Sequence, residues 1–506
     1  MVPVRVSNTL LAVLFVAPVF AGCIVGDTPE EPLQDVLPSL VNATLKDAEG
    51  AIASLALIAG LDADGTPLWY ETSRLDGRIE NKTIGAEVDR LVAWSNGSAY
   101  EITFEAQGRA DLVLSDTLVD LPHPAPVSER IAFTDSTFPL QLGTTCLEKD
   151  DGDMGCGLDE PSIEVDGRGW IYYTAVCCFF VSSPVWVSKD GGATFEPLEH
   201  PMKDVYGNEG DLAIDDEGNL YYMDIDLATF GIARWNAELE PQYSYRRPGE
   251  PLVDRPWIRA GEGGVVHAIY NTGVDTVYYR STDHALTFSA APEARFGSAL
   301  ARAYSDVQRG IVGMVNAGDY MESTDAGVTW GERTDVPRCS ADTASVDEAG
   351  NVWYQGKGCV IGRLADGNWT KPMLLAPGIT KSFTWMGAGA EGAVATAYYG
   401  QIEEPSHAEA LGIETNGWYL FVSWSNDAHS ETPHWAHMLV DPDPLGFDDL
   451  GRRLGDFFQT VIGPDGAIHI AYSMNAEMDD SATSVYRKVG PVAGLAPTKP
   501  LVGPFA

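Results

Sequence analysis

The sequence predicts an all-β protein whose main part is a β-propeller of about seven four-stranded blades. Short apolar runs alternate with glycine turns along the chain, which holds 52 Gly and 31 Pro among 506 residues. A hairpin pattern also recurs at steps of about 40 to 50 residues, which is the length of one four-stranded blade. Apolar residues make up 45% of the chain, so a sizeable core can be buried.

The first residues predict a secretory signal. "MVPVRVSN" carries one Arg and no acid, and the apolar run that follows it is too short for a membrane span. "FAGC", which ends at Cys23, resembles the lipobox of prokaryotic lipoproteins, and this resemblance implies a lipid on the Cys23 thiol. The alternative is an ordinary signal peptide with an incidental Cys. We expect a lipoprotein signal peptide over 1–22, a polar tether over 23–40, and an exported chain anchored to the outer face of the cell membrane.

Residues 41–125 lack the hairpin repeat. Their apolar runs and glycine turns predict a small β-rich N-terminal domain, followed by a Pro-containing linker at 121–130. The propeller is expected over 126–495. Its first segment, "RIAFTDSTFPLQL", could supply the strand that closes the ring against the last blade.

Each hairpin repeat consists of an apolar strand, an acidic glycine turn and an aromatic-rich strand, as in "DLAIDDEGNLYYMDID". Copies start at 161, 211, 256, 303, 343, 384 and 459. Seven copies predict seven blades, with six as the runner-up if one copy belongs to a flanking element. The long last step is interpreted as an insertion around 400–450, where His429, His434 and His437 are expected in an exposed polar loop.

An octapeptide recurs between the hairpins: "SKDGGATF" at 188–195, "STDHALTF" at 281–288 and "STDAGVTW" at 323–330. The pattern S-x-D-x-G-x-T-F/W resembles the Asp box, or BNR repeat, of sialidase-like propellers. The matching residues are Ser188, Asp190, Gly192, Thr194 and Phe195, then Ser281, Asp283, Thr287 and Phe288, then Ser323, Asp325, Gly327, Thr329 and Trp330. We expect a structural role in the turn between the outer strands of a blade, because Asp and Ser side chains can accept hydrogen bonds from the turn's own amides.

Charged residues stand where the hairpins begin, and in a propeller these segments converge on the central axis. The candidate binding residues are Glu160, Asp211, Asp254, Asp342 and Asp456. The sialidase resemblance implies three arginines that hold an acidic sugar and a Tyr nucleophile assisted by Glu. The matching catalytic candidates are Arg255, Arg302, Arg453, Tyr304 and Glu209. The family's F/Y-R-I-P motif is missing, and the alternative is that these charges form ion pairs between loops.

Two hypotheses for the function follow, and the sequence leaves open whether the protein is an enzyme. The first is a lipid-anchored cell-surface propeller that binds glycan or protein ligands on its loop face without catalysis. The second is a sialidase-type exo-glycoside hydrolase that acts on acidic sugars.

The charge balance limits the partners. Asp and Glu number 73 against 32 Lys and Arg, a net charge of −41, which repels nucleic acid. We expect a monomer whose membrane contact runs through the lipid. No motif requires a cofactor. Asp150, Asp151 and Asp153 in an acidic loop are candidate ligands for Ca²⁺.

Cysteine usage agrees with export. Of seven Cys residues, Cys23 is assigned to lipid and six remain, an even number that predicts disulfides. Cys339 and Cys359 flank one strand-rich unit and are predicted to pair. The other four, which the sequence can connect in three ways, are Cys146, Cys156, Cys177 and Cys178.

Overall fold

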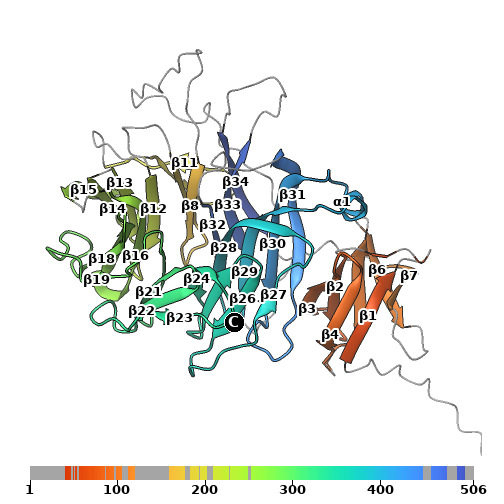
Figure 1. Ribbon diagram of the computed structural model, residues 1–506. Coiled ribbons are helices and arrows are strands. Elements are labelled where there is room, and N and C mark those ends of the chain that lie inside the picture. The colour runs from red at the N-terminus through yellow and green to blue at the C-terminus, as the bar shows by residue number, and fades with distance from the viewer. Residues whose placement is uncertain are drawn as a thin grey trace, which may run out of the picture. The chain divides into compact units, whose positions relative to one another are not determined.

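The computed structural model confirms the all-β fold class with seven successive propeller sheets (Figure 1). It describes residues 40–46, 50, 52–53, 56–85, 87–95, 98–104, 112–119, 159–176, 183–192, 194–201, 209–226, 228–248, 252–447, 457–475 and 487–495. Cys23, Cys146, Cys156, Cys177, Cys178, Asp150, Asp151, Asp153, Arg453 and Asp456 lie outside these ranges, as do the linker and the expected closing strand.

Each blade is an antiparallel sheet built from consecutive strands, with the first strand innermost. Blade 1 holds β8 (Asp159–Val165), β9 (Ile171–Val176), β10 (Val185–Ser188) and β11 (Glu196–Pro197). Blade 2 holds β12 (Glu209–Ile214), β13 (Leu220–Ile225), β14 (Thr229–Trp235) and β15 (Pro241–Pro248). Blade 3 holds β16 (Asp254–Ala260), β17 (Val266–Asn271), β18 (Thr276–Ser281) and β19 (Ala294–Arg295), with a short 3₁₀ turn at Glu262–Gly264.

The second half of the ring follows the same order. Blade 4 holds β20 (Arg302–Asp306), β21 (Ile311–Asn316), β22 (Asp319–Ser323) and β23 (Thr334–Asp335). Blade 5 holds β24 (Ala341–Val346), β25 (Val352–Gly356), β26 (Cys359–Arg363) and β27 (Met373–Leu374). Blade 6 holds β28 (Thr380–Ala388), β29 (Val394–Gln401), β30 (Gly417–Ser425) and β31 (Ala436–Phe447). The described part of blade 7 holds β32 (Gln459–Ile462), β33 (Ile468–Asn475) and β34 (Arg487–Leu495).

The innermost strands form a closed ring. β8 contacts β12, each following innermost strand contacts the next, and β32 of blade 7 contacts β8 of blade 1. The described strands therefore form seven blades, not six. Side chains on both faces of each sheet are covered by the neighbouring blades, which explains why a strand such as β13 is buried at every position.

The expected insertion around 400–450 is wrong. This stretch contains β30 and β31, the two outer strands of blade 6, and the extra length goes into long strands and a loop that carries the helix α1 (Pro405–Leu411). His434 is only 6% exposed and stacks on Trp69 with ring centroids 4.3 Å apart, so the predicted exposed histidine loop is also wrong there. Among the described residues, no helix is long and apolar enough to cross a bilayer.

A separate seven-stranded sheet precedes the propeller, as the sequence predicts for its β-rich N-terminal part. Its strands are β1 (Leu40–Lys46), β2 (Leu57–Leu61), β3 (Pro67–Thr72), β4 (Arg78–Thr83), β5 (Arg90–Ser95), β6 (Ser98–Phe104) and β7 (Leu112–Val119). The order is β3-β2-β5-β6-β7-β1-β4, and β1 pairs with β7 in parallel. Hydrogen bonds join β3 to β31 of blade 6 and the residue before it: Thr72 N–H donates to the Trp435 carbonyl at 3.0 Å, and His437 N–H donates to Thr72 Oγ1 at 2.7 Å.

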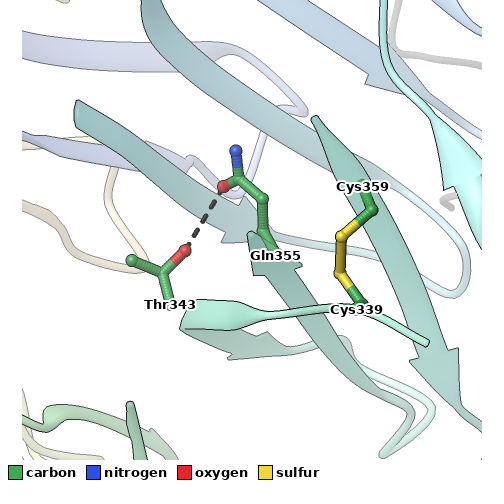
Figure 2. Close-up of a disulfide and its surroundings, with 4 residues drawn as sticks. All are labelled: Cys339, Thr343, Gln355 and Cys359. Atoms are coloured by element: carbon green, nitrogen blue, oxygen red, sulfur yellow. Dashed lines mark hydrogen bonds between the residues drawn. A yellow bond between two sulfur atoms is a disulfide. The ribbon is translucent and has the colours of Figure 1, made fainter. Parts of the chain in front are cut away.

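The predicted disulfide between Cys339 and Cys359 is confirmed (Figure 2). It links the segment that enters β24 to the first residue of β26, so it crosses one blade from its first to its third strand. On β24 and the intervening β25, Thr343 Oγ1 donates to Gln355 Oε1 at 3.3 Å. The bridge stabilises blade 5 at the end where its innermost strand begins.

Candidate functional site

The ends at which the innermost strands begin form what we call the upper rim. These first residues are Asp159, Glu209, Asp254, Arg302, Ala341, Thr380 and Gln459. Strand pairing is irregular here in β8, β16, β24 and β28, because each has a β-bulge near its start. The bulged residues Glu160, Arg255 and Phe383 have φ of 50°, 47° and 44°, a left-handed conformation that side chains with a Cβ rarely adopt. Bulges of this kind redirect side chains and are frequent beside binding sites.

Glu209 is the most deeply placed acid of the upper rim. Its side chain is 7% exposed, and Oε2 accepts a hydrogen bond from the Arg255 backbone N–H at 3.4 Å. Oε1 is fully buried and has no hydrogen-bond partner. Burial raises the pKa of Glu209 well above its usual value; the negative charges of Glu160 and Asp254 raise it further, whereas Arg255 lowers it.

The structure thus brings together four sequence-predicted residues from three blades: Glu160 of blade 1, Glu209 of blade 2, and Asp254 and Arg255 of blade 3. We call these four residues the rim cluster. Glu160 and Asp254 place two carboxyl groups beside one guanidinium, and a positive charge near Glu209 would favour the ionised form of that third carboxyl, so the rim cluster favours a cation. A cation that approached Glu209 would also provide the partner that Oε1 lacks.

The proposed Tyr304–Glu209 pair is wrong. Tyr304 lies on β20, and its hydroxyl donates to Glu322 Oε2 at 3.0 Å and lies 3.3 Å from the Tyr354 hydroxyl, inside the contact between blades 4 and 5. Burial raises the pKa of Tyr304 well above its usual value. A nucleophilic Tyr beside Glu209 is therefore not assembled, because the Tyr304 ring points into the neighbouring blade rather than toward the axis.

Two further candidates at the upper rim contact each other. The Arg302 guanidinium lies 5.3 Å from the ring centre of Trp385, and its Nη1 donates to the Asp342 carbonyl at 3.4 Å. Asp342 Oδ1 in turn accepts from the Ala317 N–H at 3.1 Å. These contacts tie the loops of blades 4, 5 and 6 together, and the structure does not show Arg302 in a shared clamp with Arg255.

Asp211, the remaining described candidate, belongs to a buried polar network below the rim. Its Oδ1 accepts from Ser162 Oγ at 2.7 Å and from Gln459 Nε2 at 2.9 Å. Its Oδ2 accepts from the Ile258 N–H at 2.9 Å and from Arg259 Nη1 at 2.7 Å. These bonds connect the innermost strands of blades 7, 1, 2 and 3 and occupy the backbone N–H groups that edge strands leave unpaired.

An axial cavity of about 230 Å³ lies inside the ring, lined by residues of all seven innermost strands. Glu164 of β8 and Arg259 of β16 are its charged lining residues. Burial raises the pKa of Glu164 to about 7; Arg259 lowers it and Asp211 raises it. An aromatic group formed by Trp257, Trp385 and Phe457 packs near this cavity, with Trp257 and Phe457 ring centres 4.9 Å apart.

Sequence reasoning missed Glu164, Arg259 and Gln459. The available signal was a single charged or amide residue inside or beside an otherwise apolar innermost strand, as in "SIEV" and "WIRA". Such a residue breaks the expected pattern of a strand covered on both faces, and it can be accommodated only where a polar partner or a cavity lies beside it.

The three octapeptides lie between the third and fourth strands of blades 1, 3 and 4. In the third copy, Ser323 Oγ accepts from the Gly327 N–H at 2.9 Å, and Asp325 accepts from the Thr329 N–H at 2.8 Å and from its hydroxyl at 2.6 Å. The first two copies repeat these bonds. Hydrogen bonds from Thr329 lower the pKa of Asp325 to about 2.

The octapeptides also contact the preceding blade. Phe288 packs on Phe230 of blade 2 with ring centres 5.8 Å apart, and Trp330 packs on Tyr278 of blade 3 at 4.7 Å. The Tyr245 hydroxyl of blade 2 donates to the Ala285 carbonyl inside the second copy. The Ser, Asp and Thr side chains of the motif are hydrogen-bonded within the turn, and its aromatic rings pack between blades, so the geometry gives these residues a structural role.

One group of metal-ligand type occurs among the described residues: Asp215, Glu217 and His284, whose ligand atoms lie within 4.8 Å of one another. Asp215 Oδ2 already accepts from Asn219 Nδ2 and from the Tyr221 hydroxyl, both at 2.8 Å. Asp347 makes the equivalent bonds to Asn351 and Trp353 in the corresponding turn of blade 5. Because the same arrangement forms without a histidine, it serves the hairpin turn.

Comparison with known proteins yields fold-level likeness only. No protein-family model and no curated protein matches the chain. Similar solved structures include YCF48 bound to a D1 peptide, 14% identical over 77% of this chain and 98% of that chain, with a TM-score of 0.41. Virginiamycin B lyase from Staphylococcus aureus is 13% identical over 67% and 94%, with a TM-score of 0.40. U3-55K is 11% identical over 66% and 95%, with a TM-score of 0.43.

Proposed function

We propose that this protein is an exported, lipid-anchored surface propeller that binds a glycan or protein ligand at its upper rim, without catalysis. The observation that carries the proposal is the rim cluster: three blades contribute Glu160, Glu209, Asp254 and Arg255 to one place. Two of these residues sit on bulges in left-handed conformation, and Glu209 keeps a buried oxygen without a partner. Such strain and incomplete hydrogen bonding are common where a protein is organised for a ligand rather than for stability.

Binding at the rim is tested by reversing one exposed charge. Asp254→Lys changes the rim cluster, and Glu332→Lys makes the same change at an exposed site on blade 4. The full chain and both variants are applied to a glycan array and to an array of random peptides. We expect the ligands of the unchanged protein to bind Glu332→Lys equally well and Asp254→Lys at least tenfold more weakly. Equal binding by both variants, or no ligand on either array, would contradict the proposal.

The lipid anchor is proposed from the "FAGC" resemblance at Cys23. A diacyl chain contributes about 0.8 kcal/mol per buried CH₂, which is enough to keep a soluble domain on a membrane. In a bacterial expression host, the unchanged chain is expected in the membrane fraction and Cys23→Ala in the soluble fraction. Retention of Cys23→Ala on membranes would exclude this anchor.

Catalysis is tested separately with a fluorogenic sialoside. The displacement of Tyr304 from Glu209 supports a binding protein, since the two groups that a sialidase needs together contact different partners. We expect no turnover above background. Turnover that disappears in Arg255→Ala would instead establish the hydrolase.

The Ca²⁺ site at Asp150, Asp151 and Asp153 and the monomeric state stay predictions.

A further inference from the structure

Three large apolar side chains are exposed beside the rim cluster. Leu252 is 60% exposed, Val274 83% and Leu300 46%. Isolated apolar residues on a protein surface are ordinary, but a group of them beside one turn marks an interaction site. We call Leu252, Val274 and Leu300 the apolar trio.

A single turn holds the apolar trio together. Val274 lies in the turn between β17 and β18 of blade 3, and Leu252 packs against that turn so closely that a Cβ at Gly273 would lie 2.8 Å from Leu252 Cδ1. The segment that contains Leu300 is bound to the same turn, because Gly297 N–H donates to Asp275 Oδ1 at 2.9 Å and Ala301 N–H donates to Thr276 Oγ1 at 3.2 Å. The three side chains therefore surround one corner of blade 3.

Backbone strain accompanies two members of the trio. Leu252 has φ of 63° and Leu300 has φ of 71°, in the left-handed region that usually holds Gly or Asn. A left-handed conformation is unfavourable for a residue with a Cβ, because the Cβ comes too close to the following carbonyl oxygen. Leucine is thus a poor choice for folding at both positions, and in water its exposed side chain adds nothing to the core. A partner that covers these side chains would explain both features.

The apolar trio adjoins the rim cluster along the chain. Leu252 is separated from Asp254 by one residue, so their Cα atoms are at most about 7 Å apart. An apolar contact surface therefore borders a group of three carboxyls in a protein of net charge −41. The matching ligand carries positive charge next to apolar side chains. Polypeptides with Lys or Arg beside Leu, Ile or Phe have this combination, whereas neutral and acidic glycans do not.

We propose that the upper rim over blades 2 and 3 binds a protein segment in which a Lys or Arg is flanked by large apolar residues, an inference that rests on the proposed function. The cationic group hydrogen-bonds to Glu209 Oε1, the buried oxygen without a partner, and lies between Glu160 and Asp254. The apolar side chains of the segment cover Leu252, Val274 and Leu300. Burial of apolar area then adds to the charge interaction.

The test is a selection of random dodecapeptides displayed on phage against the immobilised full chain. Selected peptides are synthesised, and their dissociation constants are measured by fluorescence anisotropy with the unchanged protein and four variants. Val274→Ser removes an exposed member of the trio, and Val328→Ser, at a 61% exposed position on blade 4, is its matched control. Asp254→Lys and Glu332→Lys form the corresponding charge pair. Thermal unfolding checks that all four remain folded.

We expect selected peptides to combine Lys or Arg with large apolar residues, to bind Val274→Ser about fivefold more weakly than Val328→Ser, and to bind Asp254→Lys at least tenfold more weakly than Glu332→Lys. Peptides without basic residues, or equal loss in Val274→Ser and Val328→Ser, would overturn the inference. If the glycan array yields ligands that depend on Asp254 but no peptide is selected, this inference fails and the proposed function stands. If neither array nor selection yields a ligand sensitive to Asp254→Lys, both fail.

Discussion

A carboxyl group inside the propeller ring shows how a single residue responds to its position. Glu164 lies on an innermost strand and faces the axial cavity, where water can solvate only part of its charge. Its pKa is raised to about 7, mainly by burial, despite the nearby Arg259 guanidinium. Glu164 therefore changes charge near neutral pH, unlike an ordinary surface glutamate.

The raised pKa of Glu164 predicts that the stability of the folded protein depends on pH. The Glu164 carboxyl ionises near 4.5 in the unfolded chain and near 7 in the folded protein, so the folded state holds an extra proton between these values. Stability from this group is full below about pH 4.5, falls as pH rises, and is lost above about pH 7, a total change on the order of 3 kcal/mol. Urea denaturation from pH 5 to 8 should show Glu164→Gln becoming progressively more stable than the unchanged protein. A constant difference across this range would contradict the raised pKa.

At this scale the sequence indicated which residues stand at the upper rim but not where they point. Glu160, Glu209, Asp254 and Arg255 could be placed because each begins a recognisable hairpin. Tyr304 also begins a hairpin, yet its ring faces blade 5. Strand β20 has no bulge and its side chains alternate regularly, whereas a bulge shifts the alternation by one residue in β8 and β16. One sequence does not show which hairpins contain such a bulge.

At the scale of the elements, the octapeptide turns and the hairpin turns are stabilised by the same kind of hydrogen bond. An Asp accepts hydrogen bonds from backbone amides two or four residues later, as Asp166 does from Arg168 and Trp170. In the hairpins the second oxygen binds an aromatic residue six positions on, so Asp166 accepts from the Tyr172 hydroxyl at 2.9 Å. The repeat visible in the sequence is therefore a repeat of turn chemistry.

The octapeptide should matter for stability and not for ligand binding. Ser323 is 1% exposed, and in Ser323→Ala the Gly327 N–H loses its acceptor inside the turn. We expect a loss of about 1–2 kcal/mol in the free energy of unfolding. Thr324→Ala, at the adjacent exposed position, is the control and should change little. Guanidinium denaturation measures both, and an unchanged ligand affinity would separate this motif from the binding site.

The strands and turns of most blades could be predicted from the sequence, because glycine turns and apolar strands recur at blade spacing. The disulfide could be predicted because Cys339 and Cys359 flank one such unit. Blade 6 was not predictable to the same extent. Its strands run up to the 12 residues of β31 and enclose a helix, so the next hairpin falls outside the repeat length. The contact of β31 with β3 through Thr72 joins residues 365 positions apart, which no local pattern reveals.

At the scale of the whole molecule, the ring depends on the contact between its last and first blades. Gln459 of blade 7 is 3% exposed; its Oε1 accepts from Ser162 Oγ at 3.0 Å and from the Ile163 N–H at 3.2 Å in blade 1. Its amide nitrogen also reaches Asp211 of blade 2. One amide group thus bridges three blades at the place where the two ends of the ring meet.

Gln459→Leu should weaken the closed ring. The substitution keeps an apolar body of similar length but leaves the Ile163 N–H and part of the Asp211 carboxylate without partners. We expect a loss of about 2–4 kcal/mol in the free energy of unfolding. Gln308→Leu, at an exposed turn of blade 4, is the matched control. Equal denaturation midpoints for the two variants would show that this network contributes nothing to closure.

Each blade is one uninterrupted stretch of chain with its innermost strand first, and the rim cluster draws only on blades 1 to 3. All of its residues therefore lie within 159–260, one continuous stretch of the sequence. Substitutions in blades 4 to 7 can accumulate without touching the rim cluster, whereas exchange of that segment between related genes would transfer it intact. Changes in the rim cluster and changes in the other four blades can therefore arise independently of each other.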